Sequence, residues 1–402
     1  MLVGLDQSGV NDDGLNAAIA RASAAIKCPV ENFIVSSTHT HSSSTKGLDV
    51  AGTTFAPVAE AIVSVVQTAK SRLAPARVGY GTTQVDLNVN RDQYTAKQGW
   101  RQAANPDGPS DKTLAVVGFI GDDNVPIGVY LNYAMHPVNF YLTGVISADF
   151  PGEASRYLER FFDEHAVAVF SQGASGDQNP GFPARALGRV RSGRGPFFET
   201  VGNLPLQPQN NSQQGFNPAA AASSRQPVPP ENIAAYKQAI ARTGELVTMA
   251  GTLIGASAVR LMRDRMQFSD TARVWGGQEK FTCPGRERLD AANPTRENVL
   301  PGYKEGADVN LKVGLLRIGD IHFTTVNGEV YSNIATRLKA ASPASKTIVV
   351  TLANGRANSG YIYSDDAFSH LSFQVIGSRL QPGCAEGRII STALDLMRRS
   401  GD

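Results

Sequence analysis

The sequence predicts an α/β fold in which a mixed central β-sheet is flanked by helices and interrupted by one long loop excursion. The chain opens with a strand, a helix and a strand, which is the pattern of a βαβ unit. Short apolar runs bounded by turn residues recur further along, and residues 181–230 are rich in Pro, Asn, Gln and Ser. With 402 residues, 42% of them hydrophobic, the chain has ample apolar material for a packed core.

Periodicity predicts the individual elements in order. Short apolar or alternating runs predict strands at residues 2–5, 33–36, 77–80, 86–88, 114–120, 127–132, 167–170, 309–318, 322–326 and 347–352. Apolar residues at helical spacing predict helices at residues 13–26, 56–73, 151–162, 231–262 and 389–399. The strands at 77–80 and 86–88 are expected to form a hairpin. A second hairpin is expected around the turn-rich residues 122–124.

The composition limits the classes of partner. The 38 Lys and Arg residues against 36 Asp and Glu residues leave a net charge of +2 without a long basic run, which argues against nucleic-acid binding. No run of about 18 apolar residues occurs, so no membrane span is expected. Small-molecule or peptide-like partners are therefore favoured. We expect one domain over residues 1–402, with residues 181–230 as a long loop insertion. The insertion's arginines either line a substrate entrance or belong to a solvated loop; they are Arg185, Arg189, Arg191 and Arg194.

The three cysteines and the N-terminus bear on the compartment. Cys28, Cys283 and Cys384 form no CxxC pair, so a cysteine zinc site is not predicted. One disulfide between Cys283 and Cys384 is compatible with the sequence but is not established by it. Met1 leads directly into a predicted strand without the features of a signal peptide, so we expect the natural start to lie upstream.

Three of the six histidines stand after two predicted strands, where α/β folds place their ligands. They are His39, His41 and His136. His39 and His41 flank one residue on extended backbone, which points both rings to one face, and neutral imidazole is a common zinc ligand. The alternative is that both merely bond the Ser and Thr residues around them. The remaining three lack a motif context and are expected to be structural or exposed: His165, His322 and His370.

A carboxylate and a phenol follow the same pattern. Glu329 comes soon after the strand predicted at 322–326, and Tyr361 follows a strand and a loop rich in Gly and Asn. Two histidines and a carboxylate make a catalytic zinc set with room for water, and a phenolate can take a further position. Taken singly, Glu329 fits a surface carboxylate and Tyr361 fits a core aromatic.

Six short segments then occur in a fixed order. They are residues 34–42 (IVSSTHTHS), 88–91 (NVNR), 132–137 (NYAMHP), 169–180 (VFSQGASGDQNP), 328–329 (GE) and 360–362 (GYI). Their order resembles that of the neutral/alkaline (non-lysosomal) ceramidases, from the first residues to about residue 378. That resemblance implies a family in which a zinc ion cleaves the N-acyl amide of sphingoid lipids. Many members have a C-terminal immunoglobulin-like domain, which is not expected here.

The resemblance implies roles for individual residues. The zinc ligands that it implies are His39, His136, Glu329 and Tyr361. The residues that it places at catalytic positions are His41, Arg91, Asp177 and Asn179. His41 and Arg91 match groups that contact the reacting amide or its hydroxyls, and Asp177 matches an aspartate with a supporting role around the metal.

Two departures from the family pattern concern the substrate. Asn179 stands where the family has a serine, and Phe373 stands where it has a tyrosine. The loss of two hydroxyls predicts an altered substrate preference, with Asn179 orienting the substrate or binding the oxyanion. A metal-activated water needs no serine nucleophile, so amide hydrolysis remains expected.

The prediction is therefore a zinc-dependent amidohydrolase that cleaves an N-acyl amide with a metal-activated water. Its substrate is a small acyl amide, either a lipid or a more soluble molecule. One alternative is a zinc-dependent esterase or lactonase, and another is a catalytically inactive, metal-stabilised binding protein. The resemblance implies a secreted or periplasmic protein.

Overall fold

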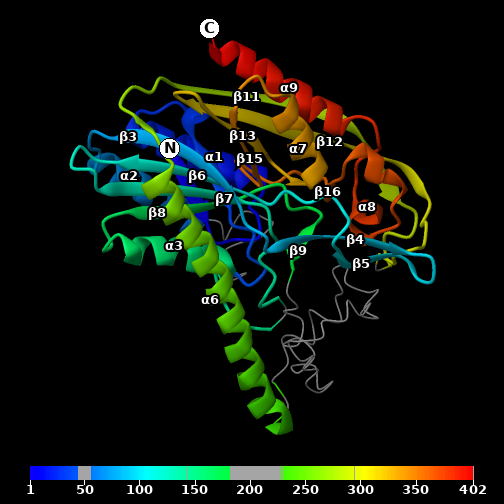
Figure 1. Cartoon of the computed structure of the whole chain (residues 1–402). Helices are drawn as coiled ribbons and strands as arrows, with labels where there is room; N and C mark the ends of the chain where they lie inside the picture. Colours follow the sequence, from blue (N-terminus) through cyan, green and yellow to red (C-terminus); the bar gives the residue numbers. More distant parts are fainter. Residues whose placement is uncertain (44–55, 142, 182–227, 229, 294, 402) are drawn as a thin grey trace.

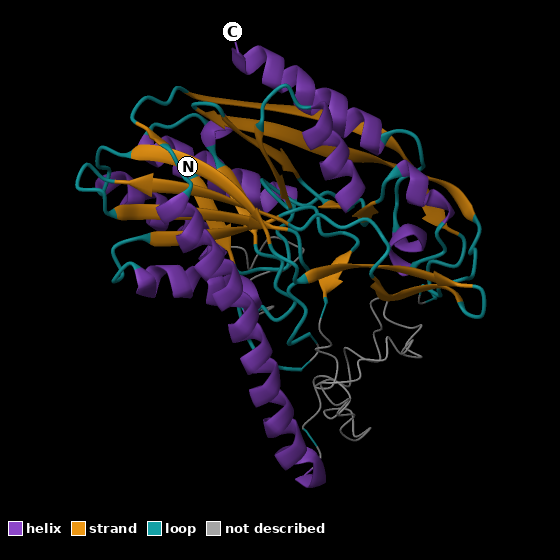
Figure 2. Cartoon of the chain, in the orientation of Figure 1, coloured by secondary structure: helices purple, strands orange, loops and turns teal. Residues whose placement is uncertain are grey.

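Two facing β-sheets, each covered on its outer side by helices, form the body of the protein (Figures 1 and 2). The computed structural model describes residues 1–43, 56–141, 143–181, 228, 230–293 and 295–401. The α/β class is confirmed, and both main sheets contain parallel and antiparallel pairs. The predicted insertion at 181–230, with its four arginines, lies almost entirely outside the described residues.

The N-terminal unit is the predicted βαβ. Strand β1 (Leu2–Leu5) and strand β2 (Ile34–Ser37) pair in parallel on either side of helix α1 (Asp12–Ile26) and the 3₁₀ turn η1 (Val30–Asn32). Helix α2 (Ala56–Ser71) packs on α1 through a small apolar core that includes Leu15, Ile19 and Ile62. The unit is a separate two-stranded sheet, and its strands lie against β8 of the neighbouring sheet.

The first main sheet has the order β10-β3-β6-β7-β8. Its strands are β10 (Phe268–Ser269), β3 (Arg77–Gln84), β6 (Thr113–Ile120), β7 (Pro126–Tyr133) and β8 (Val167–Gln172). Strands β6 and β7 form the predicted hairpin, and β7 pairs in parallel with β8. Helices α3 (Asp149–Phe161) and α6 (Ile233–Asp264) pack on its outer face, where alternate residues of β6 and β7 supply the apolar surface.

The second main sheet has the order β11-β12-β13-β15. Its strands are β11 (Val274–Arg288), β12 (Tyr303–Ile318), β13 (Ile321–Val326) and β15 (Lys346–Thr351). Helices α7 (Ser332–Ala341) and α9 (Ala385–Gly401) cover its outer face. The inner faces of the two sheets meet in a core that includes Tyr130 and Phe323, whose rings pack edge to face at 5.3 Å.

Two small sheets and several short elements lie beside this sandwich. One sheet is β5-β4-β9, formed by β4 (Asn88–Thr95), β5 (Gly99–Asn105) and β9 (Gln178–Pro180). The other is a parallel pair of β14 (Glu329–Val330) and β16 (Tyr361–Ile362). The remaining elements are η2 (Pro230–Asn232), η3 (Asp365–Ser369) and α8 (Phe373–Gly377).

Some predicted elements need correction. The hairpin expected from 77–80 and 86–88 is wrong, because β3 pairs with β6 and β10 while β4 pairs with β5 and β9. The chain therefore changes sheets between these strands. Strands β5, β9 and the long β11 were not predicted. Helix α6, with η2, is long and apolar enough to cross a membrane by length and composition only, and half of its most apolar stretch is buried inside the protein.

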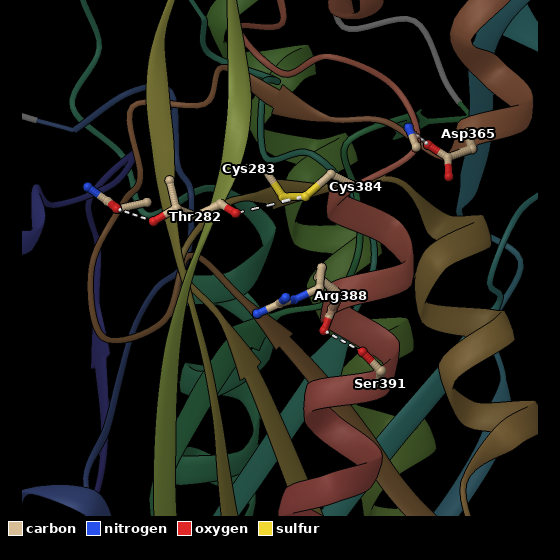
Figure 3. Close-up of a disulfide and its surroundings, with 8 residues drawn as sticks. Thr282, Cys283, Asp365, Cys384, Arg388 and Ser391 are labelled. Carbon is tan, nitrogen blue, oxygen red and sulfur yellow. Dashed lines mark hydrogen bonds between the residues drawn. A yellow bond between two sulfur atoms is a disulfide. The ribbon is translucent and has the colours of Figure 1, made fainter.

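A disulfide joins Cys283 to Cys384, as the sequence allowed (Figure 3). It links β11 to the start of α9 across 101 positions of sequence. The bond therefore fixes the C-terminal helix to the sheet that it covers.

Candidate functional site

The ends of four strands bring the predicted metal ligands together. His39 lies two residues beyond β2, and His136 lies three residues beyond β7. Glu329 and Tyr361 begin β14 and β16, and these two residues are direct partners in the parallel pair. The cluster thus joins the N-terminal unit, the first main sheet and the connections that leave the second.

His39 has an unusual backbone and a defined tautomer. Its φ is 68°, a left-handed conformation that residues other than Gly, Asn and Asp rarely adopt. Its Nδ1 contacts the carbonyl oxygen of Ser8. Because a carbonyl only accepts hydrogen bonds, Nδ1 of His39 carries a proton, and in the neutral ring Nε2 then carries a lone pair. That Nε2 lies 3.1 Å from the Nε2 of His136.

His136 presents the same kind of lone pair. Its Nδ1 donates to the carbonyl oxygens of Ser175, at 2.7 Å, and Gln178, at 3.1 Å. The side chain is fully buried. Burial, together with the nearby Arg91 guanidinium, lowers the pKa of His136 to about 3. The ring is therefore neutral near pH 7, which is the protonation state that a metal ligand needs.

Glu329 completes a set of buried acceptors. Its Oε2 lies 3.3 Å from the Nε2 of His39 and 3.6 Å from the Nε2 of His136. This oxygen is buried and has no hydrogen-bond partner among the described residues. When both rings are neutral, two lone pairs and a carboxylate oxygen face one another. Such an arrangement is unfavourable unless a proton or a metal cation lies among the three atoms.

The spacing of these atoms fits zinc. Zinc bonds of about 2.0–2.1 Å in a tetrahedron place neighbouring ligand atoms about 3.3–3.4 Å apart. The three distances among His39, His136 and Glu329 are 3.1, 3.3 and 3.6 Å. Residue type, protonation state and spacing therefore all fit one zinc ion.

His41 lies at the same cluster. Its Nε2 is 3.2 Å from the Nε2 of His39, and one ring nitrogen from each of the three histidines lies within 4.8 Å of the others. Burial, with His39 and His136 beside it, holds the pKa of His41 well below its usual range. The histidine that was expected to contact substrate is therefore as close to His39 as a ligand would be. Both roles are compatible with this distance.

Tyr361 lies beside Glu329 and Arg91. Its ring centroid is 5.3 Å from the guanidinium carbon of Arg91. Burial, followed by the Glu329 charge, raises the pKa of Tyr361 to about 12, so the free phenol keeps its proton at neutral pH. The ring of Phe373, at one of the two departures from the family pattern, packs edge to face on Tyr361 at 6.0 Å.

Arg91 is a buried cation between the cluster and Asn179. Its Nε and Nη2 donate to the Gly176 carbonyl at 3.1 and 2.6 Å, and Nη1 donates to Oδ1 of Asn179 at 3.2 Å. Its Nη2 lies 3.5 Å from the Nε2 of His136. Because Arg91 binds the Asn179 oxygen, the amide NH₂ is the end of that side chain left to serve a substrate.

Asp177 acts on the scaffold. Its Oδ1 accepts from the backbone N–H of Ser332 at 2.8 Å, and its Oδ2 accepts from the Ser332 hydroxyl at 2.8 Å and from the Asn90 side chain at 3.0 Å. Its carbonyl accepts from the Arg91 N–H at 2.8 Å. These bonds tie the start of α7 to β4. None of these described bonds joins Asp177 to a histidine of the cluster.

Arg356 is a further residue of the site, and no motif in the sequence indicated it. Its Nη2 contacts Oε1 of Glu329 at 2.5 Å. The only signal in the sequence is a cation in the Gly- and Asn-rich loop that precedes Tyr361, and such a cation is ordinarily exposed.

Comparisons with known proteins agree with the motif resemblance. Residues 28–186 match the profile of the family described as neutral/alkaline non-lysosomal ceramidase, N-terminal. No curated protein sequence matches the chain. The crystal structure of neutral ceramidase from Pseudomonas aeruginosa aligns with 99% of this chain and 66% of its own, at 17% identity and a TM-score of 0.64. A ceramidase complexed with C2 aligns with 100% of this chain and 67% of its own, at 16% identity and a TM-score of 0.66.

The chain spans about two thirds of the length of either solved structure. At 16–17% identity they show the fold, and the family profile matches residues 28–186. The chain accordingly shares the fold of the neutral ceramidases along its length and is similar to the neutral/alkaline ceramidase family over residues 28–186.

Proposed function

We propose that the protein is a zinc-dependent hydrolase of an N-acyl amide bond. The observation that carries this proposal is the set of three mutually facing acceptors, the Nε2 atoms of His39 and His136 and the Oε2 of Glu329. Tyr361 is the fourth proposed ligand, as the family resemblance implies, and it pairs directly with Glu329 in the β14–β16 register. A zinc ion bound there supplies a Lewis acid that activates water and polarises a carbonyl.

The chain's own residues have distinct tasks in this proposal. Arg91 is buried and positively charged, so it stabilises negative charge that develops on the carbonyl oxygen of the substrate. His41 is neutral and next to His39, so its ring hydrogen-bonds the reacting amide. Asn179 offers its NH₂ to the acyl or head group, since Arg91 holds its oxygen.

The substrate is proposed to be a lipid or smaller acyl amide, with ceramide used less well than in the family. Phe373 contacts Tyr361 and cannot form the hydrogen bond of a phenol. A buried polar group of ceramide left unpaired there costs about 1–3 kcal/mol. The Cys283–Cys384 disulfide supports an oxidising compartment, and hence secretion or the periplasm.

Metal content and turnover test the proposal together. The purified protein should contain about one zinc per chain by elemental analysis. It should hydrolyse an N-acyl amide, lose that activity on dialysis against a chelator, and regain it with zinc but not with magnesium. A protein without zinc, or with chelator-resistant turnover, would contradict the proposal.

The alternative activities have their own outcomes in the same assay. Faster hydrolysis of a matched O-acyl ester or lactone than of the amide would favour the esterase. Full zinc content with no turnover across amides and esters would favour a metal-stabilised binding protein.

A further inference from the structure

We propose that Arg356 is a positioning residue that sets the zinc affinity of the site by orienting the Glu329 carboxylate. The inference rests on the proposed zinc site. It assigns a role to an arginine that does not contact the histidines in any described hydrogen bond or ion pair. Three observations carry it: the division of the carboxylate between two partners, the anchoring of the arginine, and the link from that anchor to the strand that precedes His39.

The two oxygens of Glu329 have different surroundings. Oε1 contacts the Arg356 guanidinium at 2.5 Å, whereas Oε2 faces the two imidazoles and has no hydrogen-bond partner in the described part of the chain. A carboxylate held at one oxygen cannot rotate freely about its last torsion. Arg356 therefore keeps Oε2 directed at the lone pairs of His39 and His136.

The backbone before Arg356 is firmly anchored. The side-chain oxygen of Asn354 accepts from the Val35 N–H at 2.8 Å, and its NH₂ donates to the Phe33 carbonyl at 2.9 Å. The Asn354 N–H also donates to the Val35 carbonyl at 2.8 Å, and the buried Lys312 donates to the Asn354 carbonyl. These bonds attach the loop to β2 and β12 two residues before Arg356.

Two glycines allow the close packing that this position needs. Gly355 has a φ of 135°, and a Cβ there would lie 1.8 Å from a carboxylate oxygen of Asp12. A Cβ on Gly9 would lie 2.7 Å from Cδ of Arg356. The arginine side chain therefore passes directly over a residue that has no side chain, next to the loop that supplies Ser8 to His39.

Strand β2 connects the loop that carries Arg356 to His39. Val35 and Phe33 precede His39 on the same stretch of chain, so β2 positions both the first histidine and the loop that holds Glu329. The Glu329 carboxylate and the His39 ring are consequently held relative to each other before a metal arrives. Hydrogen-bonded partners of metal ligands typically contribute ten- to a hundred-fold to metal affinity.

A purely electrostatic role predicts the opposite result. A guanidinium near a metal repels the cation, so if charge alone mattered, its removal would tighten zinc binding. The sign of the change in affinity therefore separates orientation from charge.

The test measures zinc affinity by competition with a chromogenic chelator, using wild-type protein, Arg356→Met and Arg356→Lys. We expect Arg356→Met to bind zinc about ten- to a hundred-fold more weakly, with Arg356→Lys in between because lysine keeps the charge but not the planar fork. The zinc concentration that gives half-maximal hydrolysis should shift by the same factor. Thermal unfolding of the metal-free proteins reports on the fold separately.

Arg337→Met is the matched control. Arg337 is also about half exposed and contacts the mostly buried Glu386 at 2.5 Å, but it belongs to α7 and touches no residue of the cluster. Its substitution should leave zinc affinity unchanged. Equal or tighter zinc binding by Arg356→Met would overturn the inference, and so would equal weakening in both methionine variants. Wild-type protein that binds no zinc would instead overturn the proposed function, and a zinc-binding but inactive wild type would leave the affinity test decisive.

Discussion

Replacing His136 with alanine is the most direct test of the metal site, because the structure indicates that the variant folds. The Ser175 carbonyl keeps a backbone partner in the Gln178 N–H at 2.9 Å, and the Gln178 carbonyl keeps the His136 N–H at 3.1 Å. The substitution therefore leaves no buried backbone carbonyl unpaired at these positions. It opens a cavity at a fully buried site, which costs about 2–4 kcal/mol of stability.

The loss of zinc binding free energy is expected to be of similar size to that stability cost. Apparent zinc binding free energies of about 10–16 kcal/mol, shared among four ligands, correspond to about 3 kcal/mol for each. His136→Ala should accordingly bind zinc ~10²-fold more weakly. Elemental analysis after chelator competition measures this, and His165→Ala, which replaces an exposed histidine, is the control. Full zinc occupancy in His136→Ala under conditions that hold for wild type would refute the ligand assignment.

His41→Ala completes this experiment, because geometry alone allows His41 either role. If His41 contacts the substrate, the variant should keep zinc and lose turnover by ~10²–10³-fold. If it loses metal as His136→Ala does, while activity per bound zinc is unchanged, His41 is a ligand. The ligand set would then differ from the one that the family resemblance implies.

Three further results are expected. Asn179→Ser with Phe373→Tyr should raise ceramide hydrolysis relative to a simpler N-acyl substrate; efficient ceramide turnover by the unchanged protein would contradict this. Cys283→Ser with Cys384→Ser should lower the unfolding free energy by about 2–5 kcal/mol in denaturant titrations, because the bond closes a loop of 101 residues. Burial raises the pKa of Asp177 from 3.8 to about 6. The contribution of protonated Asp177 to the stability of the folded protein is therefore complete below about pH 4 and is lost as the pH rises through 6. Denaturant titrations from pH 3 to 8 should therefore show wild type losing about 3 kcal/mol relative to Asp177→Asn, and a constant difference would contradict that shift.

The sequence predicted the elements whose apolar residues are continuous or strictly periodic. The βαβ unit and the β6–β7 hairpin are examples, since local pattern and short connections suffice to define them. Strand β11 was missed because its residues include three glycines, a proline and five charged residues. It is a strand because it pairs along its length with β12, a contact that no local pattern reports.

The convergence of the residues at the candidate site was predictable from the sequence. His39, His136 and Glu329 each follow a buried strand closely, and strand ends are where an α/β fold gathers its functional groups. Arg356 was not predictable, because its role depends on an ion pair across 27 residues and on a loop anchored to a strand over 300 residues away. Neither distance leaves a trace in the sequence.

Asn179 shows how residue chemistry and family resemblance can be reconciled. It pairs with Val89 in the β9–β4 register, and its side-chain oxygen accepts from Arg91 on β4. Like a serine oxygen, an asparagine oxygen can accept this bond, so the substitution preserves a partner for a buried cation that would be costly to leave alone. An amide cannot act as a nucleophile as a hydroxyl can. The change is therefore compatible with hydrolysis only if the attacking group comes from elsewhere, and the cluster of His39, His136 and Glu329 is where the described chain offers a site for it.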